Sequence, residues 1–156
     1  MDALRRMVLR DAGIGGLLAA ALAAGLLRPR RSLAAGWNKD AFGAKTPTDA
    51  LKEIGIANPL ESKDVVIDAP QIAENGGVVP IEITSNVPGT RSIVLLIEKN
   101  PFPLVGKFDF KEGAAAFVKV NVKIGESSNL RVIAEAGGKF YAAVKEIKVT
   151  IGGCGG

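Results

Sequence analysis

Cys154 is the single cysteine of the chain and is flanked on both sides by glycine, in the C-terminal segment Gly152-Gly153-Cys154-Gly155-Gly156. Glycine has no side chain and adopts both signs of φ, so this segment has no apolar group to bury and no steric reason to hold one conformation. An extended chain advances about 3.3–3.6 Å per residue, which carries the Cys154 sulfur roughly 10 Å beyond Ile151. The pattern predicts a flexible arm, residues 152–156, that presents a thiol to other proteins.

The rest of the chain offers little chemistry to activate this thiol. It contains no histidine, which removes the commonest general base and the commonest metal ligand. The base nearest to Cys154 along the sequence is Lys148, and an ordinary thiol with a pKa of about 8.5 is only a few per cent thiolate at neutral pH. One cysteine and scattered carboxylates match no metal-site spacing. We therefore expect no catalytic residue, no metal and no other cofactor, and interpret Cys154 as a covalent attachment site that partner enzymes act upon.

The N-terminal segment predicts where the protein works. A twin arginine, Arg5-Arg6, precedes an uncharged run rich in alanine, leucine and glycine over residues 12–27, and Ser32-Leu33-Ala34 offers the small residues of a cleavage site. The run is short and weakly apolar for a membrane span. Residues 1–34 are thus predicted to be a cleaved signal peptide of the twin-arginine (Tat) type, which implies a periplasmic protein without stable membrane association after cleavage. A retained N-terminal anchor is the alternative.

The excess of positive charge belongs to this leader. Six of the 20 Lys and Arg residues and two of the 16 Asp and Glu residues lie in residues 1–34, which leaves 14 of each sign in the remainder. Nucleic-acid binding requires a basic surface excess to neutralise phosphates. A nucleic-acid partner is therefore not expected.

Two kinds of secondary structure are predicted to support the arm. Residues 35–63 form a short helical segment, because Thr46 and Pro47 are a helix cap followed by the proline favoured at a first helical position, and Gly55 is suited to end the helix. Trp37 and Phe42 are expected to pack this segment onto the rest of the domain.

Residues 64–151 show the period of two that is typical of strands. Apolar and polar side chains alternate over 79–83 and 118–124, while 93–97 is apolar throughout and predicts a central strand. Pro80 predicts an edge strand or a bulge. About seven strands at this spacing predict an all-β, immunoglobulin-like antiparallel β-sandwich. Turns are predicted at Glu74-Asn75-Gly76-Gly77, Asn86–Gly89, Lys111–Gly113 and Ala136–Lys139.

The last predicted strand changes its apolar phase. Its even-numbered residues are apolar from Phe140 to Val144, and its odd-numbered residues are apolar from Ile147 to Ile151. A β-bulge near Lys145-Glu146 would reconcile the two halves.

The chain resembles the SoxY family, the sulfur-substrate carrier subunits of the bacterial Sox thiosulfate-oxidising system. The most specific segment is the ending Val149-Thr150-Ile151-Gly152-Gly153-Cys154-Gly155-Gly156, which matches the family pattern VTxGGCGG. Two internal segments, Ala73–Pro80 and Glu98–Val105, are similar to further family signatures. The resemblance covers essentially the whole chain after the leader.

The resemblance implies that sulfur intermediates ride covalently on Cys154 during periplasmic oxidation of thiosulfate and related compounds. It also implies a heterodimer with a SoxZ-like subunit, and transient contact with a c-type haem enzyme, a di-manganese hydrolase and a molybdenum–haem sulfur dehydrogenase. The four glycines would form a swinging arm narrow enough for enzyme channels: Gly152, Gly153, Gly155 and Gly156. Export by the Tat route, which carries folded cargo, is consistent with a partner that binds before export.

Two other functions stay open. The chain could be a structural immunoglobulin-like periplasmic domain cross-linked by an intermolecular disulfide through Cys154. It could also be a sulfur carrier of the ubiquitin-like kind, which ends in Gly-Gly, although the predicted leader argues against that cytoplasmic class.

Overall fold

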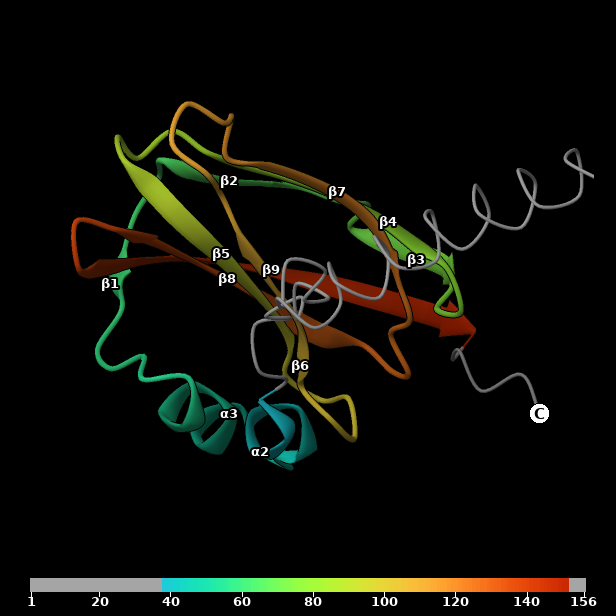
Figure 1. The fold of residues 1–156 in the computed structure, drawn as a ribbon. Helices are drawn as coiled ribbons and strands as arrows, with labels where there is room; N and C mark the ends of the chain where they lie inside the picture. Colours follow the sequence, from blue (N-terminus) through green and yellow to red (C-terminus); the bar gives the residue numbers. More distant parts are fainter. Residues whose placement is uncertain (1–37, 152–156) are drawn as a thin grey trace, which may run out of the picture. The chain divides into compact units, whose positions relative to one another are not determined.

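The computed structural model describes residues 38–151 (Figure 1). The predicted signal peptide, Trp37 and the predicted carrier arm lie outside these residues. In the described part the elements are α2 (Lys39–Gly43), α3 (Pro47–Glu53), β1 (Leu60–Glu61), β2 (Val65–Asp68), β3 (Ile72–Asn75), β4 (Val79–Ser85), β5 (Thr90–Ile97), β6 (Leu104–Asp109), β7 (Phe117–Val122), β8 (Ser128–Ala136) and β9 (Lys139–Ile151).

The strands form two sheets that pack on each other. The larger sheet has the order β1-β9-β8-β5-β6, with β3 also pairing with β9, and the smaller has the order β2-β4-β7. Alternate residues of both sheets point into one inner core, which includes Ile81 and Ile83 of β4, Leu95 of β5 and Val132 of β8. The predicted all-β, immunoglobulin-like sandwich is confirmed. The described residues contain nine strands where about seven were expected, because two short strands, β1 and β3, pair parallel to β9.

A second apolar layer covers the outer face of the larger sheet. The two helices pack there through Ala41 and Ala50, against Val94, Leu96 and Ile133. This arrangement explains why residues 93–97 are apolar on both faces: each is at most 1% exposed. The predicted central strand is confirmed, since β5 lies between β8 and β6. Phe42 packs against the same layer, as predicted.

The start of α3 follows the predicted capping pattern. The Asp49 backbone N–H donates to Thr46 Oγ1 at 3.1 Å, and Pro47 is the first helical residue. Gly55 adopts a φ of +73°, a left-handed conformation that follows the helix and favours glycine. No helix within residues 38–151 is long and apolar enough to cross a membrane.

The predicted bulge in β9 is wrong. The strand pairs with β8 from Ile147 back to Lys139 without a shift of register. Phe140 and Ala142 pack in the helix-covered layer, whereas Ile147 and Val149 pack in the inner core. The change of phase therefore marks the place where apolar cover passes from the outer face of the strand to its inner face.

The prediction that Pro80 marks an edge strand or a bulge is wrong. β4 is the middle strand of the smaller sheet, and its pairing with β7 is continuous from Val79 to Thr84. However, β2 pairs only with residues 82–85 of β4. Pro80 lies beyond that pairing, so its missing N–H disrupts no bond to β2.

Candidate functional site

Cys154 and its flanking glycines lie outside the described residues, so the structure shows the base of the predicted arm rather than the arm. That base is the end of β9, residues 148–151, which we name the arm root. β8 pairs with β9 no further than Ile147. The strand nevertheless continues for four residues beyond this point, and other parts of the chain must hold it there.

Strand β3 supports the arm root along one edge. It runs parallel to β9, with Ile72 opposite Lys148, Ala73 opposite Val149 and Asn75 opposite Ile151. The Lys148 backbone N–H also donates to the Gln71 carbonyl at 2.9 Å. Figure 1 shows β3 and the turn that follows it beside the tip of β9. The arm therefore begins from a paired strand.

Two hydroxyl groups complete the support. The Val149 N–H donates to Ser127 Oγ at 2.9 Å, and Thr150 Oγ1 donates to the Glu74 carbonyl at 3.0 Å. Each such bond contributes about 0.5–1.5 kcal/mol net. Since Val149 also packs against the inner core, the chain is held as far as Thr150.

The loop that carries Ser127 is in turn held by Asn100. Asn100 Nδ2 donates to the Lys123 carbonyl at 2.8 Å, and Asn100 Oδ1 accepts from the Gly125 N–H at 3.1 Å. Ser128 Oγ adds a bond from the Lys99 N–H at 3.0 Å. The loop between β5 and β6 thus braces the loop between β7 and β8, and through Ser127 it braces the arm root.

The turn between β3 and β4 is similarly ordered. Asn75 Oδ1 accepts from the Gly77 N–H at 2.7 Å, as predicted for turn chemistry, and the Gly76 carbonyl accepts from the Ile124 N–H at 2.7 Å. A Cβ at Gly77 would lie 2.9 Å from that Asn75 oxygen, so the turn has little room for a side chain.

The structure thereby brings together segments that the sequence left apart. Residues 73–80 and 98–105, singled out above as family-like, both meet the arm root or the loop that braces it. Sequence reasoning missed Ser127 and Thr150 as supporting residues. A four-residue parallel strand and single hydroxyl groups carry no local pattern that would have identified them.

Charges of both signs surround the arm root. Three lysines and two glutamates are exposed on the arm root and on the segments that support it: Lys99, Lys123, Lys148, Glu74 and Glu126. A clear pKa shift occurs elsewhere, at Lys119, where a hydrogen bond from its ammonium to Glu82 and the attraction between the two charges raise the lysine pKa. No group of three or more His, Cys, Asp or Glu within residues 38–151 is placed to hold a metal ion.

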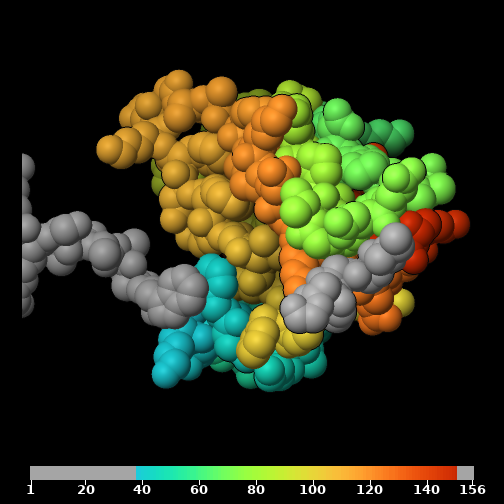
Figure 2. Space-filling view, turned by 90° about the vertical axis from the view of Figure 1, so that its right-hand side faces the viewer, coloured from blue at the N-terminus to red at the C-terminus, as the bar shows by residue number. Residues whose placement is uncertain are grey.

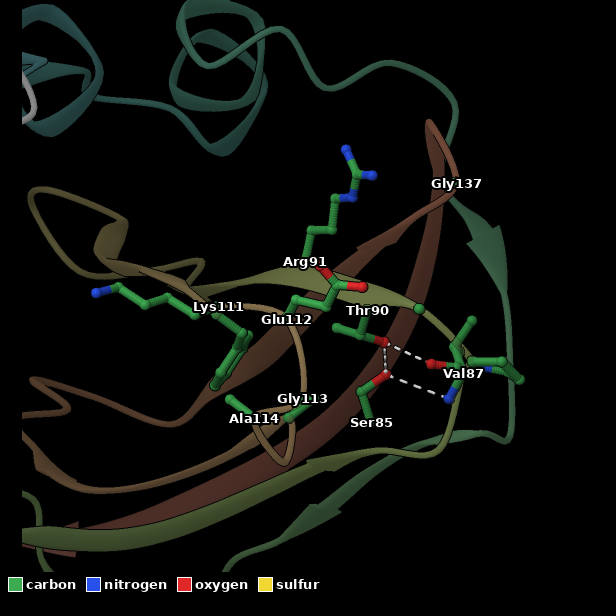
Figure 3. Close-up of a pocket in the computed structure, with 13 residues that line it drawn as sticks. Ser85, Val87, Thr90, Arg91, Lys111, Glu112, Gly113, Ala114 and Gly137 are labelled. Carbon is green, nitrogen blue, oxygen red and sulfur yellow. Dashed lines mark hydrogen bonds between the residues drawn. The ribbon is translucent and has the colours of Figure 1, made fainter.

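A pocket of about 780 Å³ lies at the other end of β9, beside Gly137 (Figure 3). Its hydroxyl groups already have partners, since Ser85 Oγ and Thr90 Oγ1 are 2.7 Å apart and Thr90 Oγ1 donates to the Val87 carbonyl at 2.7 Å. Figure 3 shows the cationic ends of Arg91 and Lys111 directed away from this pair.

Distance excludes this pocket as the working site of the thiol. β9 has 13 residues, so its two ends lie about 40 Å apart at about 3.3 Å per residue. An arm that reaches roughly 10 Å cannot span that distance.

Comparison with known proteins identifies the family. The family model described as "Sulfur oxidation protein SoxY" matches residues 49–154. The solved structure of the sulfur carrier protein SoxY from Chlorobium limicola f thiosulfatophilum aligns with a TM-score of 0.59 and 37% identity, over 65% of this chain and 92% of that chain. A search among curated protein sequences found no match.

A second solved structure, the superoxide reductase (neelaredoxin) from Ignicoccus hospitalis, aligns with a TM-score of 0.49 and 25% identity, over 67% of this chain and 92% of that chain. That similarity is too low to bear on the present chain. The SoxY match, by contrast, extends from α3 through every strand and reaches Cys154. The chain belongs to the SoxY family of sulfur-oxidation proteins and has a sulfur-carrier role in the Sox system.

Proposed function

We propose that the protein carries sulfur intermediates covalently on Cys154 while thiosulfate and related compounds are oxidised in the periplasm. The observation that carries this proposal is the arm root: a strand of the sandwich, held on β3 and by two hydroxyl groups, that ends three residues before the chain's one thiol. The membership in the SoxY family supports the same role.

The loading step joins thiosulfate to the thiol. The Cys154 S–H bond breaks, a new bond forms between the Cys154 sulfur and the outer, sulfane sulfur of thiosulfate, and one proton and two electrons leave. The electrons pass to a c-type haem enzyme, which acts as the electron acceptor. A di-manganese hydrolase then adds water across the bond between the sulfane and sulfonate sulfurs, which releases sulfate and a proton and leaves a persulfide on Cys154.

The outer sulfur of the persulfide is next oxidised to a sulfonate by a molybdenum–haem sulfur dehydrogenase: three water molecules supply the oxygen atoms, six electrons pass to the dehydrogenase and seven protons are released. The chain supplies attachment and delivery in each step, and the enzymes supply the catalytic groups. Gly152, Gly153, Gly155 and Gly156 keep the arm narrow, so that it can enter a channel that side chains would block.

The protein works as a heterodimer with a SoxZ-like subunit. Residues 1–34 direct the folded protein through the Tat route to the periplasm and are removed. The Sox enzymes are transient partners, each of which must release the arm before the next one binds it.

Intact-mass spectrometry of the periplasmic protein tests the attachment. After incubation with thiosulfate and the haem enzyme, the wild-type chain should gain the mass of one thiosulfate-derived group, and the Cys154→Ser variant should gain none. The mass of the untreated chain should correspond to cleavage after Ala34. An adduct on the Cys154→Ser variant would overturn the proposal, and a stoichiometric disulfide dimer without any adduct would favour a structural cross-linked domain.

A further inference from the structure

We propose that the c-type haem enzyme that loads Cys154 docks against the turn between β3 and β4, with Val78 as the central apolar contact. This inference rests on the proposed function and adds to it the surface that an enzyme touches. The occupant is this redox enzyme, whose reacting centre lies in a recess with an apolar patch at the mouth of the recess.

The reach of the arm limits where an enzyme can bind. The chain is held as far as Thr150 by its hydrogen bond to the Glu74 carbonyl, and Val149 is held by Ser127. The arm cannot lengthen by fraying of β9 unless these bonds break. Three residue steps of extended chain then let the Cys154 sulfur reach no further than roughly 10 Å beyond Ile151. An enzyme that takes this sulfur into a recess must bring its own surface close to the arm root.

The turn between β3 and β4 is the surface that the enzyme meets at the arm root. Asn75 pairs with Ile151, so the turn over residues 76–78 lies directly beside the point where the arm begins. Figure 2 shows the red end of β9 next to the green segment of β3 and β4. Val78 is 63% exposed, the largest exposed fraction of any large apolar side chain in residues 38–150. Its neighbour Val79 is fully buried, so Val78 is not needed to fill the core.

The turn over residues 76–78 is held by the Asn75–Gly77 hydrogen bond and by the bond from the Ile124 N–H to the Gly76 carbonyl, both 2.7 Å long. A side chain on a preordered turn loses little conformational entropy when it is buried by a partner. Full burial of a valine side chain improves binding by about tenfold or somewhat more.

Charge contributes little to docking at the arm root. The exposed charges around the arm root are mixed, three lysines and two glutamates, so they give little long-range attraction to a partner of either sign. The apolar contact then has more weight in docking. Enzyme-catalysed loading should accordingly change by less than about threefold between low and physiological salt.

The test compares Val78→Asp with Val144→Asp in the full mature chain bound to its partner subunit. Val144 is a matched control, since it is a valine 47% exposed on β9 itself, yet it lies about 23 Å along the strand from Ile151 at about 3.3 Å per residue. The measurements are KM and kcat for loading of thiosulfate by the haem enzyme. A parallel reaction of Cys154 with the small disulfide reagent DTNB reports whether the thiol remains accessible.

We expect Val78→Asp to raise KM by about tenfold or more and Val144→Asp to change it by less than about twofold, with both variants reacting with DTNB at the wild-type rate. Val78→Ile, which keeps the apolar surface, should have the wild-type KM. Wild-type kinetics in Val78→Asp would overturn the docking proposal, and so would an equal loss in Val144→Asp. Failure of the proposed function has a different signature, because the wild-type chain would then acquire no adduct at all.

Discussion

Removal of the Ser127 hydroxyl tests whether the arm root is held as the structure indicates. In the wild type, Ser127 Oγ accepts a hydrogen bond from the Val149 N–H at 2.9 Å. The Ser127→Ala variant leaves that N–H without its protein acceptor. The site is only partly buried, so water can replace the acceptor and the cost should be close to the net worth of one hydrogen bond, about 0.5–1.5 kcal/mol.

This loss should appear as easier local opening of β9 beyond Ile147. A free-energy change of about 0.5–1.5 kcal/mol corresponds to an increase of about 2- to 12-fold in the hydrogen-exchange rate of the Val149 amide. Leu95 in β5 lies in the fully buried core, so its amide should keep its wild-type rate. Hydrogen exchange followed by NMR measures both amides in the same sample.

Ser127→Thr is the control, because threonine retains the hydroxyl group and should preserve the slow exchange of Val149. The reasoning is refuted if Val149 exchanges at the wild-type rate in Ser127→Ala. It is also refuted if Leu95 accelerates by the same factor, because the hydroxyl would then support the whole domain rather than the arm root.

Two further predictions concern the brace and the arm. Asn100→Ala removes the bonds to the Lys123 carbonyl and from the Gly125 N–H, so urea denaturation should show that the free energy of unfolding falls by about 1–3 kcal/mol. The Val149 amide should again exchange faster, and unchanged exchange there would show that the brace does not reach the arm root. Replacement of Gly153 by alanine, valine and tryptophan should slow enzymatic turnover progressively while the free energy of unfolding stays within about 0.5 kcal/mol of wild type. A Gly153→Trp protein that turns over normally would contradict a steric role for glycine.

Much of the fold followed from local physical chemistry. Thr46 and Pro47 cap and start α3 in the predicted manner because a helix start needs a side-chain acceptor and tolerates a missing N–H. The predicted turn at Ala136–Lys139 is a tight hairpin in which Gly137 and Gly138 both adopt positive φ, a conformation that glycine permits at little cost. Such features depend on neighbouring residues alone, and the sequence contains them in full.

The errors arose where a pattern has more than one physical cause. In β9 the apolar residues change from even to odd positions, which a bulge would explain, but the structure keeps the register and changes the layer that covers the strand. For Pro80, the missing N–H indicated an edge strand, whereas β4 is a middle strand whose other neighbour is simply shorter. Periodicity reports which side chains are covered, and it does not report what covers them.

For the site, the sequence by itself supplied the chemical hypothesis. A single thiol among glycines, in a chain without histidine, predicts a passive attachment point whatever the fold. Only the tertiary structure decided what holds the base of that arm, because the supporting residues Glu74, Asn100 and Ser127 lie far from Val149 and Thr150 along the chain. Their contacts are single hydrogen bonds and a short parallel strand, which form only after the sandwich has brought distant segments together, and no local pattern encodes them.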